Sequence, residues 1–209
     1  MLPPLFSNPP TGLARRSASR GFTLIELMVV VLIIGILATI AVPTMVERFR
    51  ERRSSEAAQR IAALYRGARM RAMGRGSAVL VRYDSSGFKV FEAMRPKRDN
   101  VVDCPGEPSS SCLNTVWGTD SALLSSFDPV HRSEYEGVTV EAFTPGTTPA
   151  KLTDFDICFT PSGRAYERAP HTVPLTSAMV GAYTFTVQRS PGLPRTVTLL
   201  PNGASRLAL

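Results

Sequence analysis

The stretch that decides the fold reads Arg20-Gly-Phe-Thr-Leu-Ile-Glu-Leu-Met-Val-Val-Val-Leu-Ile-Ile-Gly-Ile-Leu-Ala-Thr-Ile-Ala-Val-Pro43, and Glu26 is its only charged residue after Arg20. The 19 residues of 27–45 carry no charge. As a helix they would extend about 28 Å, enough to cross the hydrocarbon core of a bilayer. An acidic side chain within such a helix costs roughly 2.5–3.5 kcal/mol on insertion scales, so Glu26 is expected to have a partner.

The composition predicts one domain with additional segments. The chain has 209 residues, of which 44% are hydrophobic, and a net charge of +7. Residues 1–21 hold three arginines, and without them the balance is 21 minus 17, or +4. This mild excess does not favour nucleic acid as a partner. The 15 glycines and 17 prolines concentrate after residue 95, which indicates a loop-rich β part.

A secretory signal peptide is one interpretation of the amino terminus, with Thr39-Ile40-Ala41 as a possible cleavage site. Three features argue against it. The apolar run is longer than the usual h-region of about 7–15 residues. It contains Glu26, and the helical pattern continues beyond it. The other interpretation places the cut after Gly21, ahead of the apolar run.

The segment Gly21-Phe22-Thr23-Leu24-Ile25-Glu26 resembles the class III signal of type IV pilins and type II secretion pseudopilins, and the likeness continues to Pro43. The resemblance implies that residues 1–21 are a leader. A prepilin peptidase would cut between Gly21 and Phe22 on the cytoplasmic side and N-methylate Phe22. It also implies a bacterial inner-membrane protein that crosses once, with a cytoplasmic amino terminus and a periplasmic carboxy-terminal domain, before it enters a filament.

The same resemblance supplies the partner of Glu26. Cleavage creates an ammonium group at Phe22, one helical turn before Glu26. In the family this glutamate neutralises the amine of a neighbouring subunit during assembly. Two buried charges are costly alone and tolerable as a pair. Glu26 is therefore predicted to be an assembly residue rather than a catalytic one. A pair with the amine of its own chain, which would serve only retention, stays open.

The helical pattern continues through residues 46–76. Pro43 is predicted to kink the helix, which would run from Leu24 to Met73 and end near Gly74 and Gly76. Glu56 and Arg60 have the spacing of a helical ion pair. The nine arginines of residues 47–75 are interpreted as a solvated face or as partners for neighbouring subunits, ahead of DNA or anionic lipid. The apolar stripe comprises Val46, Phe49, Ala57, Ile61, Leu64, Ala68 and Ala72.

The rest of the chain, residues 77–209, is predicted to be a globular β-rich domain. Residues 95–135 are expected to be its least ordered part. A long helix followed by many strands gives an α+β fold in which the helix packs on an antiparallel sheet, as in type IV pilins. The predicted strands are Ser77–Arg82, Phe88–Ala93, Gly137–Phe143, Phe155–Phe159, Ala182–Gln188, Arg195–Leu200 and Ser205–Leu209.

A second resemblance lies in the carboxy-terminal part. Phe155–Arg164 and Arg195–Arg206 resemble the GspH/FimT group, which includes H-type pseudopilins and FimT/FimU minor pilins. This implies a minor pilin that primes assembly of a type IV pilus or forms its tip complex. The alternative is an H-type pseudopilin of a type II secretion system. The implied partners are other minor pilins, the major pilin, the prepilin peptidase, the inner-membrane assembly platform and, before assembly, the lipid bilayer.

A receptor for DNA uptake is the rival of a different class. Some FimT-type members bind DNA through a Gly-Arg-x-Arg motif near the carboxy terminus. The corresponding residues here are Gly203-Ala204-Ser205-Arg206, which lack the first arginine. Nucleic acid is therefore not expected to be a partner.

The three cysteines are predicted to form one disulfide. Cys104 and Cys112 lie close together in a Pro/Gly/Ser-rich loop, which favours a bond between them in an oxidising compartment. Cys158 lies in an apolar strand and is predicted to be a buried free thiol.

No catalytic or metal-binding constellation is found. His131 and His171 are far apart, and phosphate-loop and dinucleotide motifs are absent. The segment 86–89 matches Ser-x-x-Lys, but it lies in a predicted turn and is interpreted as a coincidence. Asp154 and Asp156 are interpreted as solvated loop acids. We therefore expect neither enzyme activity nor a metal or cofactor, and an exported enzyme on a membrane stalk has no catalytic residues to support it.

Overall fold

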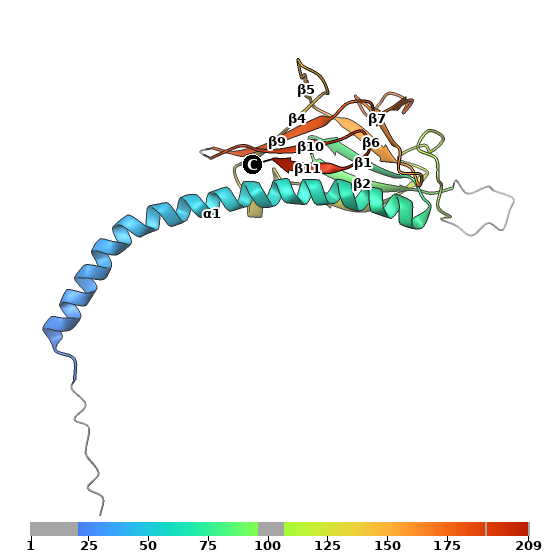
Figure 1. Ribbon diagram of the computed structural model, residues 1–209. Helices are drawn as coiled ribbons and strands as arrows, with labels where there is room; N and C mark the ends of the chain where they lie inside the picture. Colours follow the sequence, from blue (N-terminus) through green and yellow to red (C-terminus); the bar gives the residue numbers. More distant parts are fainter. Residues whose placement is uncertain (1–20, 96–106, 191, 209) are drawn as a thin grey trace, which may run out of the picture. The chain divides into compact units, whose positions relative to one another are not determined.

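The computed structural model (Figure 1) describes residues 21–95, 107–190 and 192–208. It divides into two compact units, Met1–Thr44 and Met45–Leu209. The fold is α+β, with an amino-terminal apolar helix and antiparallel β-sheets, and it is consistent with a type IV pilin-like fold. The predicted leader, residues 1–21, lies outside the described residues except for Gly21.

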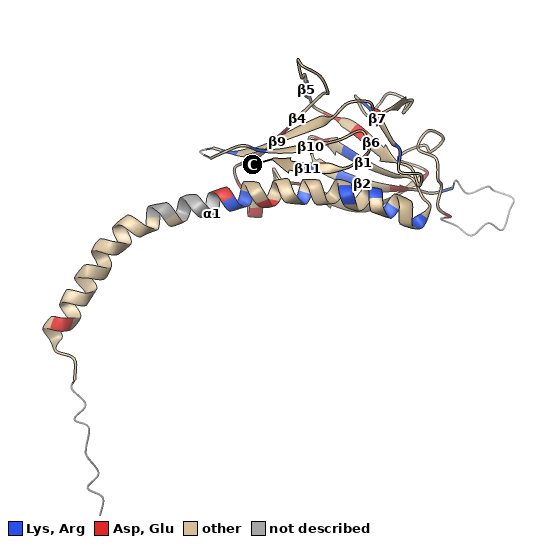
Figure 2. Ribbon diagram, in the orientation of Figure 1, with Lys and Arg blue, Asp and Glu red and all other residues tan. Residues whose placement is uncertain are grey.

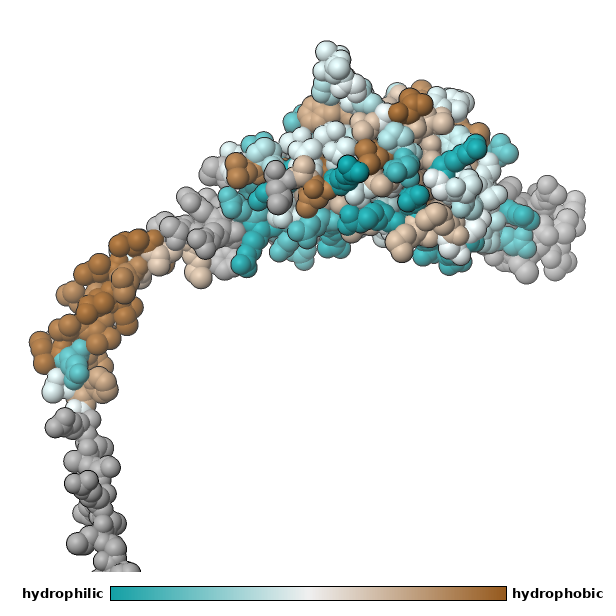
Figure 3. All heavy atoms as spheres, in the orientation of Figure 1, coloured by the Kyte–Doolittle hydropathy of each residue, from teal (hydrophilic) through white to brown (hydrophobic). Residues whose placement is uncertain are grey.

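The helix α1 (Leu24–Arg75) begins in the first unit. Its segment Leu24–Val42 is long and apolar enough to cross a membrane, and Figure 3 shows this segment in brown. Thr23 caps the helix, because its Oγ1 atom accepts a hydrogen bond of 3.3 Å from the backbone N–H of Glu26. Pro43 lies within α1, and a kink at this proline stays a prediction.

The second unit contains the rest of α1, and the predicted stripe residues Ala57, Ile61, Ala68 and Ala72 are buried there. The side chains of Val46 and Phe49 lie outside the described part of the chain. Leu64 is only partly buried, whereas its neighbour Tyr65 is fully buried. The helix ends at Arg75, close to the predicted end, where Gly76 has a φ of 69° and donates its N–H to the carbonyl of Ala72 at 3.1 Å. The fully or nearly fully buried apolar helix residues are Ala57, Ala58, Ile61, Ala62, Tyr65, Ala68 and Ala72.

Two antiparallel sheets complete the second unit. The six-stranded sheet has the order β3-β2-β1-β6-β7-β8, and the five-stranded sheet has the order β11-β10-β9-β4-β5. The strands are β1 (Val79–Asp84), β2 (Gly87–Ala93), β3 (Ser121–Phe127), β4 (Val138–Phe143), β5 (Lys151–Leu152), β6 (Phe155–Phe159), β7 (Ala165–Arg168), β8 (Ser177–Ala178), β9 (Tyr183–Arg189), β10 (Arg195–Leu199) and β11 (Ser205–Ala208).

The predicted hairpin between β1 and β2 is confirmed. Asp84 pairs with Gly87 across the turn, so the two strands are joined by two residues. Gly87 has a φ of 98°, and a Cβ atom at this position would lie 2.5 Å from the carbonyl oxygen of Phe127. Glycine is therefore required both by the turn and by the close approach of β3.

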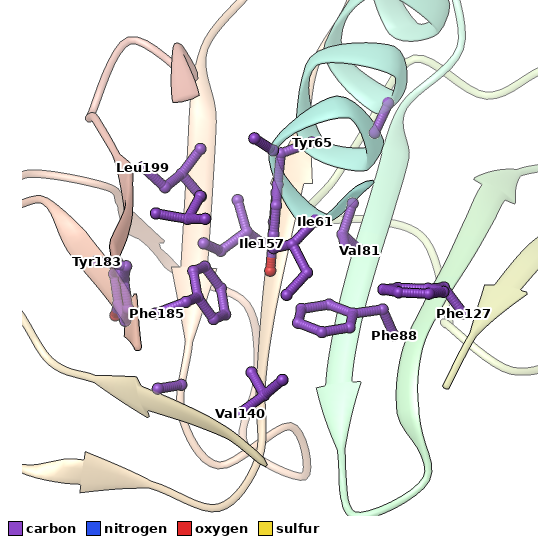
Figure 4. Packing of buried hydrophobic residues seen from close by; sticks show 14 of the residues in the cluster. Ile61, Tyr65, Val81, Phe88, Phe127, Val140, Ile157, Tyr183, Phe185 and Leu199 are labelled. Atoms are coloured by element: carbon purple, nitrogen blue, oxygen red, sulfur yellow. The ribbon is translucent and has the colours of Figure 1, made fainter. Parts of the chain in front are cut away.

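One hydrophobic core joins α1 to both sheets (Figure 4). The ring of Tyr65 from α1 meets that of Phe88 from β2 at 6.2 Å and that of Phe185 from β9 at 5.5 Å. Phe155 and Tyr183 stack with their ring centres 5.2 Å apart. Burying each such side chain stabilises the fold by roughly 1.5–3 kcal/mol, so this aromatic cluster fixes the helix against the two sheets.

The six-stranded sheet is covered on its other face as well, and this overturns the predicted cysteine pairing. Cys112 and Cys158 form a disulfide. The predicted Cys104–Cys112 bond and the predicted free thiol of Cys158 are therefore wrong; Cys104 itself lies outside the described residues. The reason is the alternation of β6, which turns Cys158 away from the helix-covered core toward a second cluster formed by Ala78, Leu80, Ala93, Cys112, Cys158 and Leu175.

Candidate functional site

The start of α1 brings together the residues that the sequence singled out. Gly21, Phe22, Thr23 and Glu26 line one open hollow, and all four are exposed. The N–H of Leu27 donates to the carbonyl of Thr23 at 3.2 Å, which closes the first helical turn. The side chains of Phe22 and Glu26 are therefore both free to contact a neighbouring molecule.

Glu26 has no ion-pair partner among the described residues. In the uncut chain the nitrogen of Phe22 is a peptide nitrogen and carries no charge. Cleavage before Phe22 would make it an ammonium group about 6 Å along the helix axis from Glu26. A carboxylate at this position can pair with the amine of its own chain or with that of a neighbour, so the geometry allows both alternatives.

Thr23 is a further residue of this site, and the sequence analysis gave it no role of its own. It accepts the hydrogen bond from the N–H of Glu26, and Thr23-Leu24-Ile25-Glu26 has the Ser/Thr-x-x-Glu pattern of a capping box. That pattern is the signal that would have found it. Glu26 therefore occupies a helix position where a negative charge is favourable, in addition to any role in assembly.

Gly21 is not required by the local structure. No described atom outside its chain neighbours lies within 4 Å of a Cβ atom built at Gly21. A larger side chain would therefore find space at this position. A requirement for glycine here would have to come from another molecule that recognises the segment.

The other titratable residues singled out by the sequence lie in structural contacts. His131 Nδ1 lies 2.8 Å from Asp128 Oδ2, and the backbone N–H of His171 donates to Asp154 at 2.7 Å. Each histidine is thus held by a separate aspartate. No group of three or more His, Cys, Asp or Glu residues within the described ranges is placed to hold a metal ion.

Asp156 is not a solvated loop acid, and that interpretation is wrong. Its side chain is fully buried on β6, where Arg82 donates to it at 2.8 and 3.0 Å and Arg168 at 2.7 Å. The two arginines come from the neighbouring strands β1 and β7, directly opposite Asp156. Two guanidinium groups therefore neutralise this buried carboxylate, and its role is to join three strands.

The Ser-x-x-Lys match is part of the β1–β2 turn. The backbone N–H of Ser86 donates to Asp84 at 2.8 Å, and Lys89 Nζ donates to the same carboxylate at 3.1 Å. Both residues of the pattern therefore hold the turn by contacting Asp84.

Comparisons with known proteins find matches to the amino-terminal segment that contains this site. Residues 16–42 match the model of the prokaryotic N-terminal methylation motif. The chain carries a type IV prepilin signal. This pilin-like chain is also 55% identical, over 47 residues, to the type IV major pilin protein PilA of Myxococcus xanthus (strain DK1622). The match covers 22% of this chain and 21% of the relative, so it spans about a fifth of the relative's length. No solved structure matches the chain.

Proposed function

We propose that this pilin-like chain is a minor pilin of the GspH/FimT type, a structural subunit that primes assembly of a type IV pilus or forms its tip complex. The observation that carries the proposal is the position of Glu26, exposed one turn after Phe22 at the start of an apolar helix. The sequence analysis found no catalytic or metal-binding motif, which fits a structural role.

The proposal assigns a separate role to each of four segments of the chain. Residues 1–21 are the leader, residues 22–45 cross the membrane and later enter the filament core, and residues 46–76 continue the helix. Residues 77–209 form the globular domain. The open space around Gly21 supports the leader, since the prepilin peptidase rather than the fold would then require glycine. The Cys112–Cys158 bond supports a periplasmic location for the globular domain, because that compartment is oxidising.

An H-type pseudopilin of a type II secretion system is the alternative. The segments that resemble FimT/FimU minor pilins, Phe155–Arg164 and Arg195–Arg206, resemble H-type pseudopilins equally. Deletion distinguishes the two, because loss of a minor pilin changes the number or length of pili, whereas loss of a pseudopilin blocks secretion of exported proteins.

The first experiment is mass spectrometry of the amino-terminal peptide from purified filaments. We expect the mature chain to begin at Phe22 and to carry an N-methyl group. A mature chain that begins at Val42, as after a secretory signal peptide, would contradict the proposal. So would an intact Met1 in assembled filaments.

The second experiment replaces Glu26 with Gln. This change removes the charge but keeps the shape, so a neighbour's Phe22 ammonium would be buried without its counter-charge, at a typical cost of about 3–5 kcal/mol. We expect Glu26→Gln to be inserted and cleaved but to enter filaments at least about tenfold less, since 1.4 kcal/mol is a factor of ten. The measurement is the ratio of filament-associated to membrane-associated protein.

A matched control is Thr39→Val, which also removes a polar group from the apolar helix. Thr39 Oγ1 donates to the carbonyl of Ile36 in its own helix, at 2.7 Å. This variant should enter filaments normally. If Glu26→Gln is cleaved and enters filaments as well as Thr39→Val does, Glu26 is not an assembly contact.

A further inference from the structure

A small basic pocket lies in the second unit between α1 and the turn that joins β10 to β11. Its volume is about 190 Å³. Figure 2 marks arginine positions in blue along this half of the α1 ribbon. The residues that line the pocket are Arg66, Arg69, Met70, Gly203, Ala204 and Ser205.

The turn and the helix hold each other in place at this pocket. Ser205 Oγ donates to the carbonyl of Ala62 at 2.8 Å, and Arg66 Nη1 donates to Ser205 Oγ at 3.4 Å. Gly203 has a φ of 76°, and a Cβ atom there would lie 2.7 Å from the ring of Phe159 and 2.9 Å from Cδ of Arg69. The pocket is therefore a packed feature of the domain, and glycine is required at its edge.

The two arginines of the pocket differ from Arg71 and Arg82, which are neutralised by carboxylates. Arg71 pairs with Glu92, and Arg82 pairs with Asp156. Within residues 21–95, 107–190 and 192–208, neither Arg66 nor Arg69 has a carboxylate partner, and the Nε atom of Arg69 is buried without a hydrogen bond. A buried donor without an acceptor is unfavourable, so this site favours an incoming anion.

The lining also indicates the kind of anion. Met70 and Ala204 supply apolar surface, and the aliphatic stems of the two arginines add to it. A glutamate side chain matches this arrangement, because its two methylene groups can lie on the apolar surface while its carboxylate meets the guanidinium groups. A phosphate group offers charge but no apolar part.

The same helix carries an exposed glutamate without an ion pair. Glu56 was predicted to pair with Arg60, and that prediction is wrong. Arg60 instead lies over the ring of Phe127, 4.9 Å from its centre, and donates to the hydroxyl of Tyr135 at 3.5 Å. Glu56 is left exposed, with no ion pair among the described residues.

We infer that the Arg66–Arg69 pocket binds the Glu56 side chain of a second copy of this chain, which makes it a contact between neighbouring subunits. The inference rests on the proposed function. Glu56 precedes the two arginines by 10 and 13 residues, or about 15–20 Å along α1. Two parallel copies displaced by this distance would place Glu56 of one copy over the pocket of the next. Because donor and acceptor lie on different surfaces, the contact is heterologous and can propagate along a filament.

The first test is a disulfide between engineered cysteines in the full chain, Glu56→Cys together with Met70→Cys. Met70 lines the pocket and is 68% exposed. The two positions are 14 residues apart on one helix, about 21 Å, so a bond between them cannot form within one chain. We expect disulfide-linked dimers and higher species from assembled filaments on a non-reducing gel.

The controls for this test are the two single-cysteine variants and the pair Glu56→Cys with Met73→Cys. Met73 is exposed on the same helix but does not line the pocket. The single variants also report any pairing with Cys104. Linked species that are no more abundant in the Glu56–Met70 pair than in these controls would overturn the inference.

The second test exchanges the charges. Arg66→Glu alone and Glu56→Arg alone should each lower the ratio of filament-associated to membrane-associated protein by on the order of fivefold to tenfold. The double variant should restore the ratio. Arg132→Glu, an exposed arginine away from the pocket, changes the net charge equally and should have no effect. A double variant that assembles worse than either single variant would overturn the inference.

Three further outcomes distinguish the pocket contact from nucleic-acid binding and from failure of the proposed function. If Arg66→Glu abolishes retardation of a short DNA duplex by the full chain and Glu56→Arg does not restore assembly, the pocket binds phosphate and the inference is wrong. If the parent chain is absent from filaments, the proposed function itself fails. If the parent and both single charge variants assemble equally, only the pocket contact fails.

Discussion

Arg71 Nη2 lies 2.7 Å from Oε2 of Glu92, and this ion pair ties the last turns of α1 to β2. Glu92 is 1% exposed. Its other carboxylate oxygen accepts a hydrogen bond of 2.6 Å from Ser77 and lies 3.2 Å from Nε of Arg75. The carboxylate is therefore buried but fully partnered, and three residues near the end of the helix depend on it.

Removing this carboxylate should destabilise the globular domain. Glu92→Ala leaves Arg71 and the hydroxyl of Ser77 without their acceptor, and we expect a loss of about 2–4 kcal/mol in the free energy of unfolding. Partial exposure of Arg71 and Arg75 keeps the loss below that of a fully buried pair. Urea unfolding of residues 45–209 measures it. Glu136→Ala, at an exposed glutamate, should change the free energy by less than about 0.5 kcal/mol.

Glu92 should also make the stability of the domain depend on pH. Burial acts to raise the pKa of Glu92, but the hydrogen bonds from Ser77 and Arg71 and the charge of Arg75 outweigh it, so the pKa lies below its usual value. A lowered pKa stabilises the folded state above the unfolded-state pKa of about 4.3, and this stabilisation is lost as the pH falls through the folded-state pKa. The difference in unfolding free energy between the parent and Glu92→Gln should therefore shrink below about pH 4. Urea titrations between pH 2 and pH 7 test this, and a difference that is constant with pH would contradict it.

Glu167 should give the domain the opposite dependence of stability on pH. Burial raises the pKa of Glu167, a hydrogen bond with Tyr183 offsets this only in part, and its Oε2 atom is buried without a partner. A carboxyl group whose pKa is raised disfavours the fold once it ionises, so the cost is absent at low pH and present at neutral pH. Glu167→Gln should therefore raise the melting temperature at pH 7 and leave it nearly unchanged at pH 3. Equal shifts at both pH values would show that the charge is not responsible.

The Cys112–Cys158 bond should contribute strongly to stability. The two cysteines are 46 residues apart, and closing a loop of that length gives about 4 kcal/mol in the chain-entropy model. Cys112→Ser and Cys158→Ser should each lower the free energy of unfolding by about 2–4 kcal/mol. Cys104→Ser is the control and should have no such effect. Peptide mapping without reduction should yield a peptide that links Cys112 to Cys158.

Two glycines, Gly67 in α1 and Gly203 at the edge of the basic pocket, should respond differently to replacement by alanine. Gly67 lies inside α1 with nothing within 4 Å of its Cβ position, so Gly67→Ala should stabilise the helix by about 1 kcal/mol. Gly203 has a φ of 76° and no room for a Cβ atom, so Gly203→Ala should destabilise the domain by about 1–3 kcal/mol. Thermal unfolding compares them, and a shift in the same direction for both would contradict this packing.

The sequence predicted the elements that carry strong periodic patterns. The apolar run and the stripe beyond it predicted α1 to within two residues at its end. Alternating apolar residues predicted β9 and β10, and a turn between two apolar runs predicted the β1–β2 hairpin. These signals are local, because each depends on residues within one helix face or one strand.

The missed features depend on contacts between distant residues. The strand β3 reads Ser-Ala-Leu-Leu-Ser-Ser-Phe and lies in the segment expected to be least ordered, and its small polar residues give no alternating pattern. The strand β7 has only one buried residue, Ala165. The disulfide and the burial of Asp156 both follow from the covered second face of the six-stranded sheet, which no single segment of the sequence reveals.

The disulfide also determines how the domain responds to a pulling force. Force applied to the two ends of the chain cannot extend the 46-residue segment between Cys112 and Cys158. At about 3.3–3.6 Å per extended residue, roughly 150–165 Å of chain is thereby excluded from stretching. An oxidised subunit that unfolds under tension would lengthen by that much less than a reduced one. A filament of oxidised subunits would therefore extend less under the same load.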